Sequence, residues 1–123
     1  MTGVGKTKWV FPDGDLPEKD PSTGLEAHEA LMILNTGDQL AEVALSFYFS
    51  DREPIEDVQL QVPAKRVLCF RMDHPGEIGG VELPFRTQYA VQVESSVPVV
   101  ATFGRLDTAS DRMAFYSSAW HAE

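Results

Sequence analysis

Two short patterns resemble parts of catalytic motifs, and each lacks the residues that would complete it. Gly5-Lys6-Thr7 matches the end of a phosphate-binding loop, but that motif also needs a strand and an earlier glycine, and here the chain has barely begun. His28-Glu29 matches the start of a zinc-protease motif, but Met32 stands where the second histidine would be. No serine lies in a Gly-x-Ser-x-Gly turn. The chain is therefore not expected to be an enzyme.

The histidines and the single cysteine do not form a metal-binding pattern. His28, His74 and His121 are far apart, and no spacing among them and Cys69 matches a structural zinc site. Cys69 lies in the run Val67-Leu68-Cys69-Phe70, where we expect an inert, small buried hydrophobe rather than a nucleophile. No metal and no cofactor are predicted.

A second group of charged residues lies at the ends of predicted strands. In a β-sandwich the strand ends and loops gather at two poles, so residues far apart in sequence can converge there on one ligand. Equally, each residue could stabilise a turn or form a surface ion pair. The group consists of His28-Glu29, Asp51-Arg52, Lys65-Arg66 and Arg105-Leu106-Asp107.

The elements that must position these residues are short strands. Alternating apolar and polar residues predict strands with one buried face at 42–49, 58–62 and 89–94. Other β-prone runs predict strands at 7–11, 30–34, 66–72, 97–103 and 113–120. No segment sustains helical periodicity for three turns. About eight strands with closely spaced turns indicate a sandwich or barrel, and we predict a single all-β antiparallel β-sandwich.

Turn-forming residues separate these strands. Asn35-Thr36-Gly37-Asp38 predicts a hairpin between its flanking strands, because Asn and Gly tolerate a tight backbone. Ser95-Ser96 predicts a turn, and Pro98 suggests a strand start or edge. The segment 73–80 is rich in turn formers and predicts an irregular, flexible loop.

The bulk properties of the chain limit its location. A length of 123 residues predicts one domain spanning 1–123, with 1–6 as a flexible N-terminus. The longest apolar stretches fall far short of the ~20 residues that a membrane-spanning helix needs. No charged segment followed by an apolar one opens the chain, and a lone cysteine cannot form an internal disulfide. We therefore expect a cytoplasmic protein.

The net charge limits the choice of partners. Nineteen acidic and ten basic side chains give a formal charge of −9, which repels phosphate backbones and anionic lipids at long range. Nucleic acid is therefore a poor partner. The acidity could simply keep the domain soluble, or it could attract a basic surface.

An ordered set of short motifs resembles the sensory rhodopsin transducer family. The resemblance runs from about Trp9 to about Ser118, in the order and with the approximate spacings of the family. Its motifs are His28-Glu29, Ile33-Leu34-Asn35, Ser50-Asp51-Arg52-Glu53-Pro54, Val62-Pro63-Ala64-Lys65-Arg66, Ser96-Val97-Pro98-Val99-Val100 and Arg105-Leu106-Asp107.

The resemblance implies a β-sandwich subunit of a homotetramer, a cytoplasmic protein that receives a signal from a microbial rhodopsin. Cytoplasmic loops of membrane proteins carry excess Lys and Arg, so an acidic protein could dock there on the rhodopsin. The resemblance also implies an alternative, because family members look related to carbohydrate-binding β-sandwich domains. On that view the chain is a sensor of a sugar or another small molecule, unrelated to light.

A sugar site typically combines an aromatic face with fixed polar groups. Either Trp9 or Trp120 could supply the aromatic face, although both tryptophans could instead pack in the core or at a subunit interface. We expect Arg105 and Asp107 to fix polar groups, and His28 and Glu29 to complete the site. The predicted ligand-binding residues are Trp9, His28, Glu29, Asp51, Arg66, Arg105 and Asp107.

Overall fold

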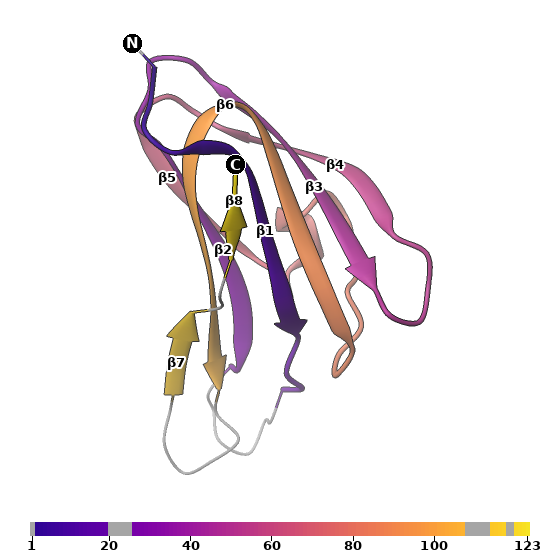
Figure 1. Ribbon diagram of the computed structural model, residues 1–123. Coiled ribbons are helices and arrows are strands. Elements are labelled where there is room, and N and C mark those ends of the chain that lie inside the picture. The colour runs from indigo at the N-terminus through magenta and orange to yellow at the C-terminus, as the bar shows by residue number, and fades with distance from the viewer. Residues whose placement is uncertain (1, 20–25, 108–113, 118–119) are drawn as a thin grey trace.

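The computed structural model describes residues 2–19, 26–107, 114–117 and 120–123, which contain eight strands and one short 3-10 helix (Figure 1). The elements are β1 (Lys6–Asp15), β2 (His28–Asn35), β3 (Ala41–Phe49), β4 (Ile55–Val62), β5 (Arg66–Arg71), η1 (Pro75–Glu77), β6 (Gln88–Asp107), β7 (Ala114–Ser117) and β8 (His121–Ala122). No helix in these described ranges is long and apolar enough to cross a membrane.

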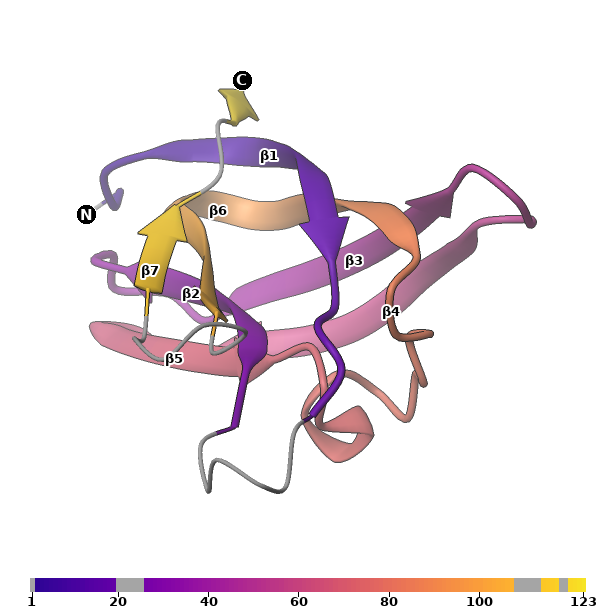
Figure 2. The ribbon, with the colours of Figure 1, turned by 90° about the horizontal axis from the view of Figure 1, so that it is seen from below.

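The strands form two antiparallel sheets that share β6. Sheet A has the order β4-β3-β6-β1-β8, and sheet B has the order β5-β2-β6-β7. Seen from below, β1 and β5 lie on opposite sides of the interior (Figure 2). The predicted all-β antiparallel sandwich is therefore confirmed.

The interior is filled from both sheets by the inward side of each alternating strand. In β3 the residues at odd positions, Val43, Leu45 and Phe47, are fully buried, as the period-two pattern predicts. Burying one such side chain stabilises the fold by roughly 1.5–3 kcal/mol. Phe11 and Tyr89 both contact Phe103, with ring centroids 5.8 and 6.3 Å away. This aromatic group joins the two halves of β6 across the core.

β6 is one strand of 20 residues, so the predicted turn at Ser95-Ser96 is wrong. Its first half pairs with β1 and β3, its second half pairs with β2, and the ribbon arches over the upper end of the molecule between them (Figure 1). The pairing with β1 shifts register between Lys6 and Lys8 at this arch. Because β-branched valines favour extended backbone, the chain changes sheet through a bulged bend rather than a tight turn.

Pro98 therefore lies inside a strand and not at its start. It sits between Ser95, which pairs with β3, and Val99, which pairs with β1, at the point where the ladders change. Proline has no backbone N–H to donate, so it is tolerated at this point, where the ladders change. The indole N–H of Trp9 donates to the Val99 carbonyl oxygen at 3.0 Å and fixes the bend from inside.

The segment after β2 is not a hairpin, contrary to the prediction. β2 pairs with β5 and β6, so residues 36–40 carry the chain from sheet B to sheet A. The side chain of Asn35 is completely buried here. Its Nδ2 donates to Gln39 O at 2.8 Å and Val62 O at 3.1 Å, and its Oδ1 accepts from Gly37 N at 3.0 Å. Asn35 thus links the connection from β2 to β3 with the end of β4, where the chain passes on to β5.

Cys69 is exposed, and the expectation that it is buried is wrong. Its strand neighbour Phe70 faces the core, so the alternation of β5 turns Cys69 outward. Partial burial and the charge of Glu77 raise the pKa of the thiol, which disfavours the reactive thiolate. The predicted irregular segment 73–80 contains the 3-10 helix η1.

Candidate functional site

Charged residues gather where β1 ends, β2 begins and both ends of β6 lie, and Glu29 is at their centre. The Glu29 side chain is completely buried. The backbone N–H of Asp15 donates to both carboxylate oxygens at 3.1 Å, and the Tyr89 hydroxyl donates to Oε1 at 2.7 Å. Arg105 Nε and Nη2 each lie 2.9 Å from Oε2. We call Asp15, Glu29, Tyr89 and Arg105 the Glu29 cluster.

The close packing of the Glu29 cluster depends on a residue without a side chain. Gly14 pairs with Tyr89 across β1 and β6. A Cβ at this position would come within 2.6 Å of the Tyr89 ring. Glycine therefore allows the ring to lie flat against β1, with its hydroxyl at Glu29.

The electrostatics of the Glu29 cluster favour a structural role. Burial raises the pKa of Glu29, while hydrogen bonds from Tyr89 and Asp15 and the charge of Arg105 oppose this shift. Burial also raises the pKa of Tyr89 well above its usual value, and the nearby Glu29 adds to that rise. Tyr89 thus stays protonated and donates. Because donors from this chain occupy both Glu29 oxygens, the cluster fastens β1, β2 and β6 together.

A second cluster, which we call the Asp73 cluster, consists of Lys19, Glu26, Arg71 and Asp73. The Asp73 side chain is completely buried and accepts from Arg71 Nε and Nη2 at 2.7 Å and from Lys19 Nζ at 2.5 Å. Burial opposes its charge, but the hydrogen bonds and charges of Arg71 and Lys19 outweigh burial and hold its pKa well below the usual value. Glu26 also contacts both cations, at 3.4 and 3.5 Å.

The two clusters are joined through the backbone. Met72 N, next to Asp73, donates to the carbonyl oxygen of Glu29 at 3.0 Å. The Asp73 cluster therefore ties both described ends of the β1–β2 connection to the end of β5. In the described ranges, no group of three or more His, Cys, Asp or Glu side chains is placed to hold a metal ion.

The structure brings together two of the residues predicted to bind a ligand, Glu29 and Arg105. His28 precedes Glu29 but points elsewhere, because its Nδ1 lies 2.8 Å from Glu26 O in an exposed contact. Asp107 ends β6, and its side chain lies outside the described part of the chain.

The other three predicted residues lie away from this pair. Trp9 is 7% exposed and belongs to the core. Asp51 pairs with Arg52 in the exposed turn between β3 and β4. Arg66 begins β5 opposite Asn35, at the far end of β2 from Glu29. A single convergent site made of all seven residues is therefore not what the described residues form.

Sequence reasoning missed Tyr89, Arg71 and Asp73. Tyr89 was predicted only as an inward strand residue, although a buried tyrosine hydroxyl usually needs a partner. Arg71 and Asp73 lie at the end of the predicted strand 66–72, the same kind of position as that of the charged residues predicted to bind a ligand. Nothing in their spacing distinguishes a buried ion pair from a solvated one.

Comparison with known proteins gives a family and a set of similar structures, two of which follow. Residues 4–122 match the family described as Anabaena sensory rhodopsin transducer. The crystal structure of Thermotoga maritima 1070 is similar with a TM-score of 0.83 and 32% identity, over 97% of this chain and 96% of that one. The Anabaena sensory rhodopsin transducer is similar with a TM-score of 0.75 and 32% identity, over 88% and 93%. Curated proteins give no significant match. The predicted family resemblance is confirmed.

Replacing Arg105 by alanine tests the structural role of the Glu29 cluster. Arg105→Ala leaves a buried carboxylate without its cation, so we expect the free energy of unfolding in urea to fall by about 3–5 kcal/mol. Tyr89→Phe removes one neutral donor and should cost about 1–3 kcal/mol. Arg52→Ala is the matched control, since it breaks an exposed pair with Asp51 and should change little. Equal effects of Arg105→Ala and Arg52→Ala would contradict this role.

Proposed function

Because the chain belongs to the Anabaena sensory rhodopsin transducer family, we propose that it binds the cytoplasmic face of a microbial sensory rhodopsin or a downstream partner. In this role it is a cytoplasmic signalling protein that carries out no catalysis. The family is a non-catalytic signalling family. The observation that carries the proposal is the match over residues 4–122.

The charge of the chain supports docking on a basic surface. The formal charge is −9, and the buried carboxylates Glu29 and Asp73 are already paired with cations of the chain. The excess acidity therefore lies on the surface. Exposed acidic residues include Glu18, Glu42, Glu53, Glu56, Asp57, Glu82 and Glu94. Cytoplasmic loops of membrane proteins carry excess Lys and Arg, which such a surface attracts.

Binding to a sensory rhodopsin of the same organism, held in lipid nanodiscs, tests this proposal. We expect binding at low ionic strength that weakens by about tenfold between roughly 50 and 500 mM NaCl, because screening reduces attraction between exposed charges. A rhodopsin whose cytoplasmic Lys and Arg residues are changed to Gln is the matched control and should bind weakly at every salt concentration. Absence of binding at low salt would contradict docking on the rhodopsin and leave a downstream partner as the only proposed one.

We also propose that the chain forms a homotetramer, and that the outer face of sheet B takes part in it. Leu34 lies between Val67 of β5 and Val100 of β6 in the paired strands, and these side chains are 36%, 62% and 36% exposed. The next row consists of Cys69, Met32 and Thr102. These six residues carry no charge. Copies with a charge of −9 repel one another, so contact through an uncharged apolar face is favoured.

The mass of the particle in solution tests this assembly. We expect light scattering after gel filtration to give four times the mass of the chain. Val67→Lys places a charge in the uncharged face and should lower that mass, because desolvating an unpaired ammonium is costly. Tyr48→Lys adds the same charge to the outer face of sheet A and should leave the mass unchanged. A monomeric wild-type protein, or dissociation only with Tyr48→Lys, would contradict the proposal.

A second candidate function, a sensor of a sugar or another small molecule, is favoured by the outer face of sheet A. Tyr48 is 39% exposed there. Ser46, two residues earlier on the same face of β3, pairs with Gln92 of β6. An aromatic ring beside hydroxyl and amide groups is a combination typical of sugar sites. The Glu29 cluster offers a second polar group to a ligand. Its member Arg105, with 17% of its side chain exposed, is the one that a ligand could reach.

A thermal-shift series with neutral mono- and disaccharides tests the second candidate. A ligand that binds only the folded state raises the unfolding midpoint in a saturable way. We expect Tyr48→Ala to abolish the shift and Tyr48→Phe to keep most of it, since the ring is retained. A shift of the same size in Tyr48→Ala would place the ligand elsewhere, and no shift with any sugar would contradict this candidate.

A further inference from the structure

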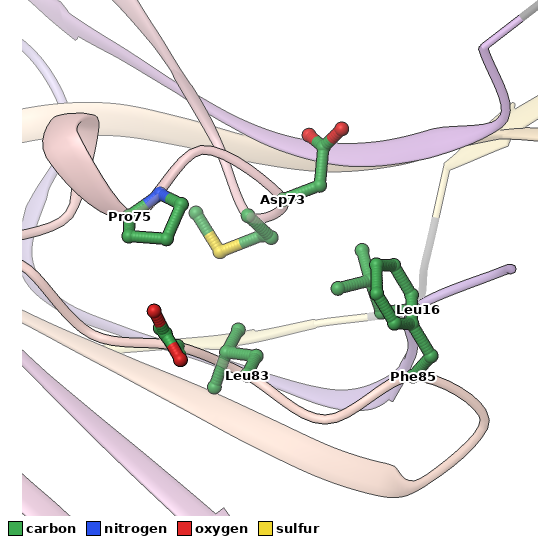
Figure 3. A pocket seen from close by; sticks show the side chains of 7 residues that line it. Leu16, Asp73, Pro75, Leu83 and Phe85 are labelled. Atoms are coloured by element: carbon green, nitrogen blue, oxygen red, sulfur yellow. The ribbon is translucent and has the colours of Figure 1, made fainter. Parts of the chain in front are cut away.

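A small hollow lies beside the Asp73 cluster, between the end of β1, the end of β5 and the segment before β6 (Figure 3). Its volume is about 180 Å³, which is below the roughly 300–1,000 Å³ of sites that hold a whole drug-sized ligand. Its apolar walls are Leu16, Met72, Pro75, Leu83 and Phe85. The hollow is therefore of a size for one side chain rather than for a larger molecule.

The walls are held in place by the core. Leu16, Met72 and Leu83 are at most 7% exposed, whereas Phe85 is 46% exposed. The backbone N–H of Arg86 donates to Leu16 O at 2.8 Å, which fixes the segment carrying Phe85 against the end of β1. Such an arrangement is formed before any partner arrives.

The polar lining of the hollow carries one sign of charge. Asp73 and Glu82 are the polar residues among the described residues that line it, and none of those lining residues is basic. Figure 3 shows the Asp73 carboxylate pointing away from the other labelled side chains, as its ion pairs with Lys19 and Arg71 require. Glu82 is exposed, and among the described residues no basic side chain forms an ion pair with it. The two cations and two carboxylates of the Asp73 cluster balance one another, so Glu82 gives the lining its net negative charge, which attracts a cation.

We propose that this hollow receives a lysine side chain from the basic surface of the binding partner. The proposal rests on the proposed function and names the contact through which an acidic chain would hold a Lys-rich loop. The four-carbon stem of lysine lies along Leu16, Leu83 and Met72, and its ammonium group stays near water beside Glu82. The exposed ring of Phe85 can attract the same cation with its face.

Titration of the ¹⁵N-labelled protein with Nα-acetyl-L-lysine methylamide tests the proposal by nuclear magnetic resonance. We expect saturable shifts of the amides of Met72, Leu83 and Phe85, with a dissociation constant of about 1–10 mM for so small a probe. Nα-acetyl-L-norleucine methylamide has the same stem without the charge and should give no saturable shift. Equal shifts with both probes, or none at these amides, would overturn the proposal.

Two variants with the same change of net charge separate the hollow from general attraction. Glu82→Gln should weaken binding of the lysine probe by about fivefold, and Phe85→Ala should weaken it by a similar factor. Glu56→Gln removes an exposed carboxylate from β4 in sheet A and should leave the affinity unchanged. If Glu56→Gln weakens binding of the probe as much as Glu82→Gln does, the attraction is not specific to the hollow and the proposal fails.

The same variants distinguish this proposal from the proposed function. If the rhodopsin binds wild type and Glu82→Gln equally well, the lysine contact is wrong while docking on a rhodopsin stands. If the lysine probe fills the hollow with the expected specificity but no rhodopsin binds at any salt concentration, the lysine contact stands while that partner is wrong.

Discussion

The buried carboxylate of Glu29 is the constraint on which the rest of the structure depends. A charge taken out of water is tolerated only where several donors surround it. Those donors come from the end of β1 through Asp15, from the start of β6 through Tyr89 and from its other half through Arg105. Because the two halves of β6 belong to different sheets, satisfying this one group fixes the position of sheet A relative to sheet B. Gly14 leaves the space that the Tyr89 ring needs to bring its hydroxyl to Glu29.

The acidic residues of the chain form two sets, one buried and one exposed. The buried carboxylates are matched by cations of the chain, as Arg71 and Lys19 match Asp73. The unmatched acids are exposed, and the outer row Val67–Leu34–Val100 of sheet B is free of charge. In the assembly and docking that we propose, the uncharged row would contact other copies of the chain and the exposed acids would contact a basic partner. The two proposed contacts share no residues.

The period-two patterns predicted the sheet class well because burial decides which face of a strand is apolar, as in Val43, Leu45 and Phe47. Connections were predicted less well. Asn35-Thr36-Gly37-Asp38 has hairpin chemistry, yet Asn35 bonds two crossings between sheets, because long-range pairing with β5 and β6 outweighs local turn preference. The site was predicted only in part, because the position of a residue at a strand end does not show whether its side chain is buried. Strand-end position pointed to Glu29 and Arg105, which lie together, but it did not decide between a ligand site and the core for Trp9, and it gave no sign that Asp73 would be buried.

The arch of β6 has a consequence for the order in which the chain can fold during synthesis. β1 pairs with β6 and β8, so Lys6 meets Val99 only after most of the chain has left the ribosome. The pairs β2–β5 and β3–β4 can form earlier, but the strand that joins them into one body is made later. Such long sequence separations slow folding and leave apolar strands exposed meanwhile. A nascent chain of which only residues before 88 have emerged from the ribosome would therefore carry two separate strand pairs and an unpaired β1, which chaperones would recognise.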